Sequence, residues 1–82
     1  MPLSGSDLSR ALQHMETGDW QAAHEIVQRD EESRLACWAH GIVHIMEGDL
    51  PNARYWYAQA HRSFPSKPSA PEEIRALKAA AK

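Results

Sequence analysis

Five histidines in 82 residues are the part of this sequence with the clearest potential for chemistry. His40 and His44 are four residues apart in a stretch with helical character, and a histidine pair at this spacing can chelate zinc. At about 100° per residue, Cys37 and Glu47 fall on the same side of that helix. A thiolate and a carboxylate could therefore complete a set of metal ligands there.

The alternative role for these histidines is packing between helices. Four side chains of one helix cannot surround an ion tetrahedrally, so the fold would have to bring in His14 or His24 as well. His14 and His44 each stand four residues before a Gly-Asp pair. A flat, partly buried ring with one hydrogen bond could fill the space between helices there. We favour packing, and we expect neither a metal nor another cofactor.

Motifs typical of enzymes are absent from the sequence. Cys37 is the only cysteine, which excludes an internal disulfide, and we expect it to be a small buried core residue. There is no glycine-rich phosphate loop, no CxxC pair and no Gly-x-Ser-x-Gly nucleophile motif. The aromatic run 55–57, with Arg54 and Arg62 nearby, could stack on bases and contact phosphate, but its three rings point in three directions on a helix. We therefore expect neither an enzyme nor a nucleic-acid-binding protein.

The net charge of −2 gives no global field that would attract nucleic acid or a membrane surface. The charge is unevenly distributed, however. Residues 1–49 carry nine acids and three arginines, a balance of −6, and residues 50–82 carry six basic residues and two acids, a balance of +4. This asymmetry could help the C-terminal part to dock on the rest or favour head-to-tail association. Solvated helix faces are the interpretation that we favour.

The sequence also lacks the signals of a secreted or membrane protein. The first seven residues have neither the charged nor the apolar region of a secretory signal. The apolar runs fall far short of the roughly 20 residues that cross a bilayer. We expect a cytoplasmic protein.

The histidine pair is carried by the stretch 33–48, which is apolar over more than half of a helical circumference. Its apolar stripe consists of Leu35, Trp38, Ile42, Ile45 and Met46, widened by Ala36, Ala39 and Val43. A helix this apolar is usually enclosed by neighbours, so we expect it to be the central helix of a small bundle.

Helices are also expected on both sides of this central one. The predicted ranges are 7–17, 20–29, 50–63 and 72–80. Ser4 or Ser6 can cap the first of them. Gly18 and Gly48 can each close a helix in the left-handed conformation, and the aspartate that follows each glycine can cap the next helix.

The two glycine turns are copies of each other. Gly18-Asp19-Trp20-x-x-Ala23 and Gly48-Asp49-Leu50-x-x-Ala53 are thirty residues apart, and repeated helical hairpins indicate a helical-repeat protein. With these turns, and with the small or aromatic residues Gly41, Tyr57, Ala60 and Pro65, the chain resembles the tetratricopeptide family. It departs from the family pattern at Asp30, where a small residue is usual.

The resemblance implies an all-α fold in a single domain, 1–82. Two helical hairpins, 7–30 and 31–64, would form a right-handed α-α superhelix. A Pro-rich connector, 65–71, and a C-terminal capping helix, 72–80, would follow.

In tetratricopeptide proteins the first helices of successive hairpins line a concave surface that holds peptides. If the first helices of the two hairpins in this chain line the same kind of surface, the resemblance implies a partner-binding surface there. It would be made of Leu8, Leu12, Met15, Leu35, Trp38, Ile42 and Ile45. An apolar surface of this size is normally covered. We expect a non-catalytic protein–protein interaction module that binds another protein, a peptide or an amphipathic helix. A structural homodimer closed by the same surface is the alternative, and a His/Cys metal-binding protein is a less favoured one.

The last helix has two possible positions. Its thin apolar stripe, Ile74, Leu77 and Ala81, could pack on the fourth helix as a cap. Alternatively, an extended connector at about 3 Å per residue reaches roughly 20 Å, enough to fold the last helix back across the apolar surface as a resident ligand.

Overall fold

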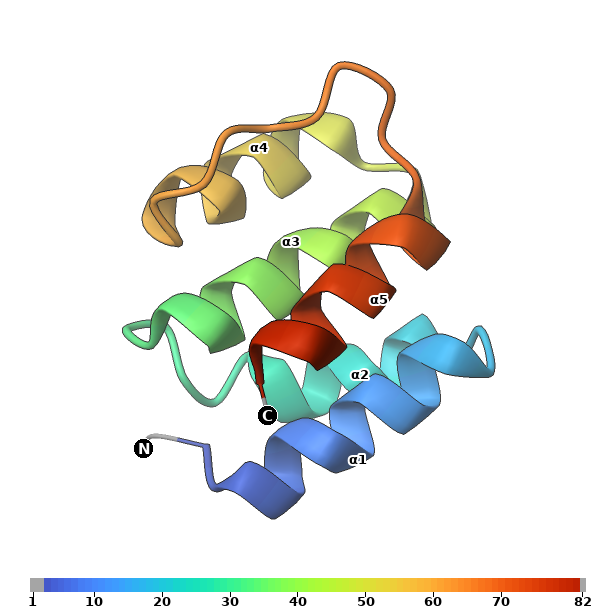
Figure 1. Cartoon of the computed structure of the whole chain (residues 1–82), viewed down its shortest axis with the longest axis vertical. Coiled ribbons are helices and arrows are strands. Elements are labelled where there is room, and N and C mark those ends of the chain that lie inside the picture. The colour runs from blue at the N-terminus through green and yellow to red at the C-terminus, as the bar shows by residue number, and fades with distance from the viewer. Residues whose placement is uncertain (1–2, 82) are drawn as a thin grey trace.

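The structure is a computed structural model that describes residues 3–81. It places five α-helices and no strand in that range (Figure 1), which confirms the all-α class. The helices are α1 (Gly5–Glu16), α2 (Trp20–Val27), α3 (Arg34–Glu47), α4 (Leu50–Gln59) and α5 (Ala70–Ala80). Between residues 3 and 81, none of these helices has the length and apolar character needed to span a membrane.

The two turns predicted to be copies have the same backbone geometry. Gly18 and Gly48 are left-handed, with φ of 84° and 89°. In each turn the aspartate after the glycine donates its N–H to the carbonyl five residues earlier, at 2.8 Å in the first turn and 2.9 Å in the second. Its carboxylate then accepts the N–H three residues later and caps the next helix. The turns therefore join α1 to α2 and α3 to α4 as two hairpins.

Helix α3 lies at the centre of the molecule, as its apolar circumference predicted. It packs against all four other helices, and every residue from 36 to 44 is buried. Two of the buried residues are His40 and His44, which are 4% and 7% exposed. The histidine pair is therefore part of the interior and not of a solvated face.

Helix α4 approaches α3 closely at Gly41. A Cβ atom at this position would lie 2.5 Å from Cδ1 of Tyr57 and 3.2 Å from the carbonyl oxygen of Ala53. Tyr57 is 1% exposed, and Ala53 and Ala60 are buried on the same side of α4. The ring of Tyr57 therefore occupies the space that a side chain at position 41 would fill.

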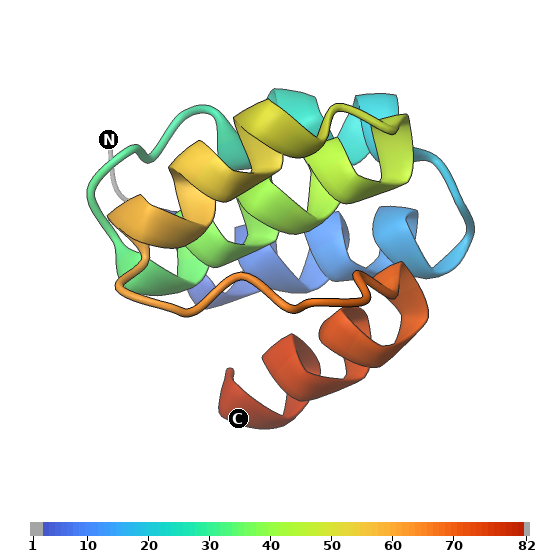
Figure 2. The ribbon, with the colours of Figure 1, turned by 90° about the horizontal axis from the view of Figure 1, so that it is seen from above.

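Helix α5 does not cap α4, so that expectation is wrong. Within residues 3–81 its backbone packs against α3 and α1 and not against α4. Figure 1 shows it running antiparallel to α1 and α3, and Figure 2 shows it on one side of the four hairpin helices. Its short apolar stripe matches the wall that α1 and α3 form together, and residues 60–69 carry the chain back to that wall.

Several helix ends differ from the predicted boundaries, by up to four residues at the end of α4. Helix α4 ends at Gln59 instead of 63, because His61 adopts a left-handed φ of 59° and the N–H of Arg62 returns to the carbonyl of Tyr57 at 3.0 Å. Helix α5 starts at Ala70, with Ser69 accepting the N–H of Glu72. The first of these differences lengthens the connector by several residues.

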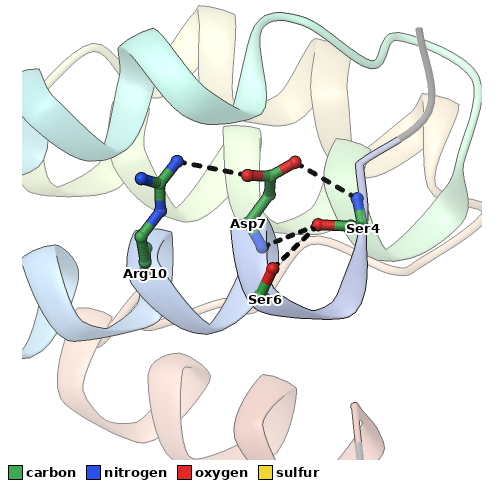
Figure 3. A network of polar contacts seen from close by, with 4 residues as sticks. All are labelled: Ser4, Ser6, Asp7 and Arg10. Atoms are coloured by element: carbon green, nitrogen blue, oxygen red, sulfur yellow. Dashed lines mark hydrogen bonds and ion pairs between the residues drawn. The ribbon is translucent and has the colours of Figure 1, made fainter.

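Ser4, and not Ser6, caps α1. Its hydroxyl accepts the N–H of Asp7 at 3.1 Å, and the Asp7 carboxylate accepts the N–H of Ser4 at 3.3 Å (Figure 3). These backbone and side-chain hydrogen bonds with Ser4 lower the pKa of Asp7. Arg10 donates to the same carboxylate at 3.1 Å. The helix therefore begins at Gly5, two residues earlier than predicted.

Asp30 stands where the resemblance to the tetratricopeptide pattern fails, and it has a role of its own in this structure. The side chain is buried, and it accepts backbone N–H groups of Ser33, Glu32 and Leu3 at 3.0 to 3.1 Å. Burial alone would raise the pKa of Asp30, but these hydrogen bonds outweigh it and lower the pKa. The carboxylate thus ties the N-terminal segment to the α2–α3 loop, which a small side chain could not do.

Replacing Gly41 with alanine should cost about 1–3 kcal/mol in packing, because the ring of Tyr57 must move. The roughly 1 kcal/mol that alanine gains over glycine in a helix interior offsets part of this cost. Urea unfolding followed by circular dichroism measures the difference. Gly5→Ala is the control, since no atom lies within 4 Å of a Cβ there. Equal stability of the two variants would contradict the close approach.

Asp30→Asn should lower the free energy of unfolding by about 1–2 kcal/mol at neutral pH, since a charged acceptor of three N–H groups becomes a neutral one. The carboxyl has a lower pKa in the folded state, so its contribution is complete above the unfolded-state pKa and disappears as the pH falls through the folded-state pKa. The difference between wild type and variant should therefore shrink between about pH 5 and pH 2 in urea titrations. A constant difference would argue against the bonded carboxylate.

Candidate functional site

The seven residues of the predicted partner-binding surface all lie on α1 and α3. Leu12, Met15, Trp38 and Ile42 are buried, and Leu8, Leu35 and Ile45 are partly buried against the core. We call the apolar face that α1 and α3 share the α1/α3 groove. It is not an open surface, since α5 covers much of it.

Helix α5 contacts the groove through a small apolar anchor. Ile74 is 7% exposed and Leu77 is fully buried, whereas most other side chains of this helix are exposed. The helix has the amphipathic character of a ligand, with one narrow buried stripe and a solvated back. Of the two positions that the sequence left open for the last helix, the structure has the one across the groove.

A single carboxylate oxygen joins three helices at the centre of this contact. Oε1 of Glu73 accepts the indole N–H of Trp38 at 3.2 Å and the hydroxyl of Tyr57 at 2.6 Å. We call this arrangement the Glu73 bridge. Burial, and then the hydrogen bond with Glu73, raise the pKa of Tyr57, so its hydroxyl stays protonated and donates.

The ring of Trp38 is held on its face as well as at its edge. The guanidinium carbon of Arg62, from the connector, lies 3.4 Å from the centroid of the indole. A second polar contact of the C-terminal part is the exposed pair Lys78–Glu16 at 3.4 Å. Such an exposed ion pair stabilises little. The charge asymmetry of the chain thus contributes less to the docking of α5 than the Glu73 bridge does.

One end of the groove is not covered by α5. Leu8 and Leu35 line a hollow there, together with Ala36 and Ala81. Ala81 directly follows the last residue of α5. The groove therefore extends beyond the C-terminal end of its occupant.

The four residues considered as metal ligands on α3 do not stay together. Cys37 is fully buried, its thiol donates to the carbonyl of Glu31 at 3.3 Å, and burial raises its pKa. His40 and His44 face α2 instead, where His24 joins them. One ring nitrogen of each of these three histidines lies within 4.8 Å of the others.

His40 is held neutral by its surroundings. Burial, followed by the neighbouring rings of His24 and His44, lowers the pKa of His40 to about 3. Burial is also the main cause that lowers the pKa of His24. The rings of His40 and His24 are therefore uncharged at neutral pH.

The aromatic run 55–57 does not form a shared stacking surface. Tyr55 is 55% exposed, while Tyr57 is buried against α3. Trp56 is stacked on His40, with ring centroids 3.9 Å apart and planes 10° apart. The three rings point in different directions, as predicted for a helix.

Glu73 was not recognised from the sequence as a contact residue, and His24 was only one of two candidates for a further ligand. Glu73 directly precedes Ile74 of the apolar stripe, which was the available signal that its carboxylate lies at the edge of a buried contact. His24 follows Ala23 and stands three residues before Val27, both of which are buried, so it lies beside the inner face of α2. Neither signal identifies the partner side chain on another helix.

No family model, curated protein or solved structure matches this chain.

Glu73→Ala should loosen α5, because Trp38 and Tyr57 both lose their shared acceptor. Hydrogen bonds to a charged group contribute about 1.5–3 kcal/mol, so amide exchange over residues 74–80 should accelerate roughly 10- to 100-fold. Exchange in α2 should not change. Glu72→Ala is the control, since its exposed side chain precedes the same stripe. Equal exchange in the two variants would mean that the bridge does not hold α5.

Proposed function

We propose that this chain is a protein–protein interaction module built from two tetratricopeptide-like hairpins, and that its α1/α3 groove binds an amphipathic helix of a partner protein. The observation that carries the proposal is α5 itself. The groove holds an amphipathic helix through two buried apolar side chains and one carboxylate. In this proposal α5 is a resident ligand that the partner replaces.

The contacts of α5 indicate the chemistry of that partner. Ile74 and Leu77 are three residues apart on one helix face, and Glu73 immediately precedes them. A partner helix would therefore carry a carboxylate, with apolar residues one and four positions after it. Binding of such a helix in a groove is a common mode of peptide recognition. The carboxylate would meet the indole N–H of Trp38 and the hydroxyl of Tyr57.

The size of the anchor makes replacement of α5 feasible. Burying two aliphatic side chains contributes about 1.5–3 kcal/mol each, and ordering the helix offsets part of this. The connector 60–69 keeps a released α5 near the groove, at an effective concentration on the order of millimolar. A partner that binds with micromolar affinity can therefore compete with α5.

Titration of the full chain with a fluorescein-labelled peptide of residues 69–81 tests the proposal. The peptide keeps its own Glu73, so it can form the bridge in trans. We expect Glu73→Ala to bind the peptide about 10- to 100-fold more tightly than wild type, because the resident helix closes the groove less often. Glu72→Ala should behave like wild type, and a peptide carrying Leu77→Ser should not bind either protein.

Tyr57→Phe is a second variant, and it distinguishes a loosened α5 from a groove that binds the peptide. It removes a donor that both α5 and the peptide use, so the apparent affinity for the peptide should stay near that of wild type. If Glu73→Ala exchanges its α5 amides rapidly but takes up no peptide at millimolar concentration, the groove is not a binding site. If Glu73→Ala instead becomes a dimer in light scattering, copies of the chain exchange α5 and the homodimer is the better account.

A further inference from the structure

A cluster of three histidines lies on the side of α3 that faces α2, away from the Glu73 bridge. His24 comes from α2, and His40 and His44 are one turn apart on α3. The ring centroids are 4.8 Å apart for His24–His40, 5.1 Å for His40–His44 and 5.4 Å for His24–His44. One ring nitrogen of each residue lies within 4.8 Å of the other two.

Packing does not account for the polar atoms of this cluster. Nδ1 of His40 is buried and has no hydrogen-bond partner within residues 3–81. A buried polar atom left without a partner costs about 1–3 kcal/mol, so it calls for a specific explanation. A packed histidine ring was expected to make one hydrogen bond, and within residues 3–81 neither the ring of His24 nor the ring of His40 makes one.

His44 has the surroundings of a metal ligand. Its Nδ1 lies 2.9 Å from Oε1 of Glu47, on the next turn of α3. A histidine that binds a metal through one nitrogen commonly donates from the other to a carboxylate, which fixes the ring and raises its basicity. With Nδ1 engaged in this way, Nε2 of His44 is the nitrogen available to a metal.

We propose that His24, His40 and His44 bind one divalent transition-metal ion of the zinc class, that Glu47 orients His44, and that the fourth position is open to water or another ligand. Three imidazoles suit zinc, and sites with three protein ligands keep one position open. The proposal is independent of the α1/α3 groove, since it uses other side chains on the opposite side of α3.

The geometry requires a small adjustment. Zinc–nitrogen distances of about 2.0–2.1 Å place tetrahedral ligand atoms about 3.4 Å apart, so a pair at the 4.8 Å limit must approach by about 1.4 Å. His24 is partly exposed and stands on the short helix α2, so its ring can turn inward and solvent can reach the site. One oxygen each of Glu47 and Asp49 lies within 4.8 Å of a His44 nitrogen, and these carboxylates offset the charge of the ion.

The test uses the full chain after removal of any affinity tag, titrated with Zn²⁺ against a chromophoric chelator and with Co²⁺ followed by visible absorption. We expect one ion per chain, and cobalt bands typical of tetrahedral nitrogen ligation. His24→Gln should weaken zinc binding at least about 100-fold, because two histidines of one helix remain. Glu47→Gln should weaken it about 10-fold, as loss of an orienting carboxylate does.

His61→Asn is the matched control. It removes an exposed histidine outside the cluster, and asparagine tolerates the left-handed backbone of that position. Zinc should raise the thermal midpoint of wild type and His61→Asn alike, and should not raise that of His24→Gln. Equal zinc affinity of wild type and His24→Gln, equal loss in His61→Asn, or no binding by folded wild type at micromolar zinc would each overturn the proposal.

Discussion

The close approach of α3 and α4 at Gly41 is the constraint on which both surfaces of this protein depend. Because position 41 has no side chain, the ring of Tyr57 lies against the backbone of α3. This places the Tyr57 hydroxyl at the edge of the groove, 2.6 Å from Glu73. The preceding residue, Trp56, is laid on His40 by the same approach. One glycine therefore sets the separation of α3 and α4, and with it the position of Tyr57 at the groove and of Trp56 at the histidine cluster.

Helix α3 presents different polar chemistry on its two sides. Towards α5 it offers the indole N–H of Trp38, and a carboxylate from another helix accepts it. Towards α2 it offers His40, whose Nδ1 has no acceptor or donor among residues 3–81. On the first side the indole N–H has its acceptor within this chain, whereas on the second side a buried ring nitrogen has no hydrogen-bond partner among residues 3–81. That contrast is why we interpret one side as a surface already holding a ligand and the other as a site for an ion.

The sequence predicted the features that depend on short-range patterns. The two Gly-Asp turns follow from local backbone and capping preferences, and the central position of α3 follows from its apolar circumference. The position of α5 could not be predicted, because the short stripe of Ile74 and Leu77 fits more than one apolar wall. The Glu73 bridge depends on where α5 lies, so the bridge could not be predicted from the sequence either.

The histidine cluster illustrates the same boundary between local and distant information. The i, i+4 spacing of His40 and His44 identified a possible chelating pair, but their third neighbour depends on how α2 is rotated against α3. His14 and His24 were equivalent candidates on the sequence, and only the packing of α2 on α3 distinguishes them. Cys37 shares the predicted side of the helix, but it is engaged with the carbonyl of Glu31 instead.

The uncovered end of the groove has a kinetic consequence. Leu8 and Leu35 remain accessible beside Ala81 while α5 is still seated. In the proposed exchange, a partner helix longer than α5 can first bind to these two leucines. It can then occupy the rest of the groove as α5 dissociates. The rate of replacement would then rise with partner concentration, instead of levelling off at the spontaneous opening rate of α5.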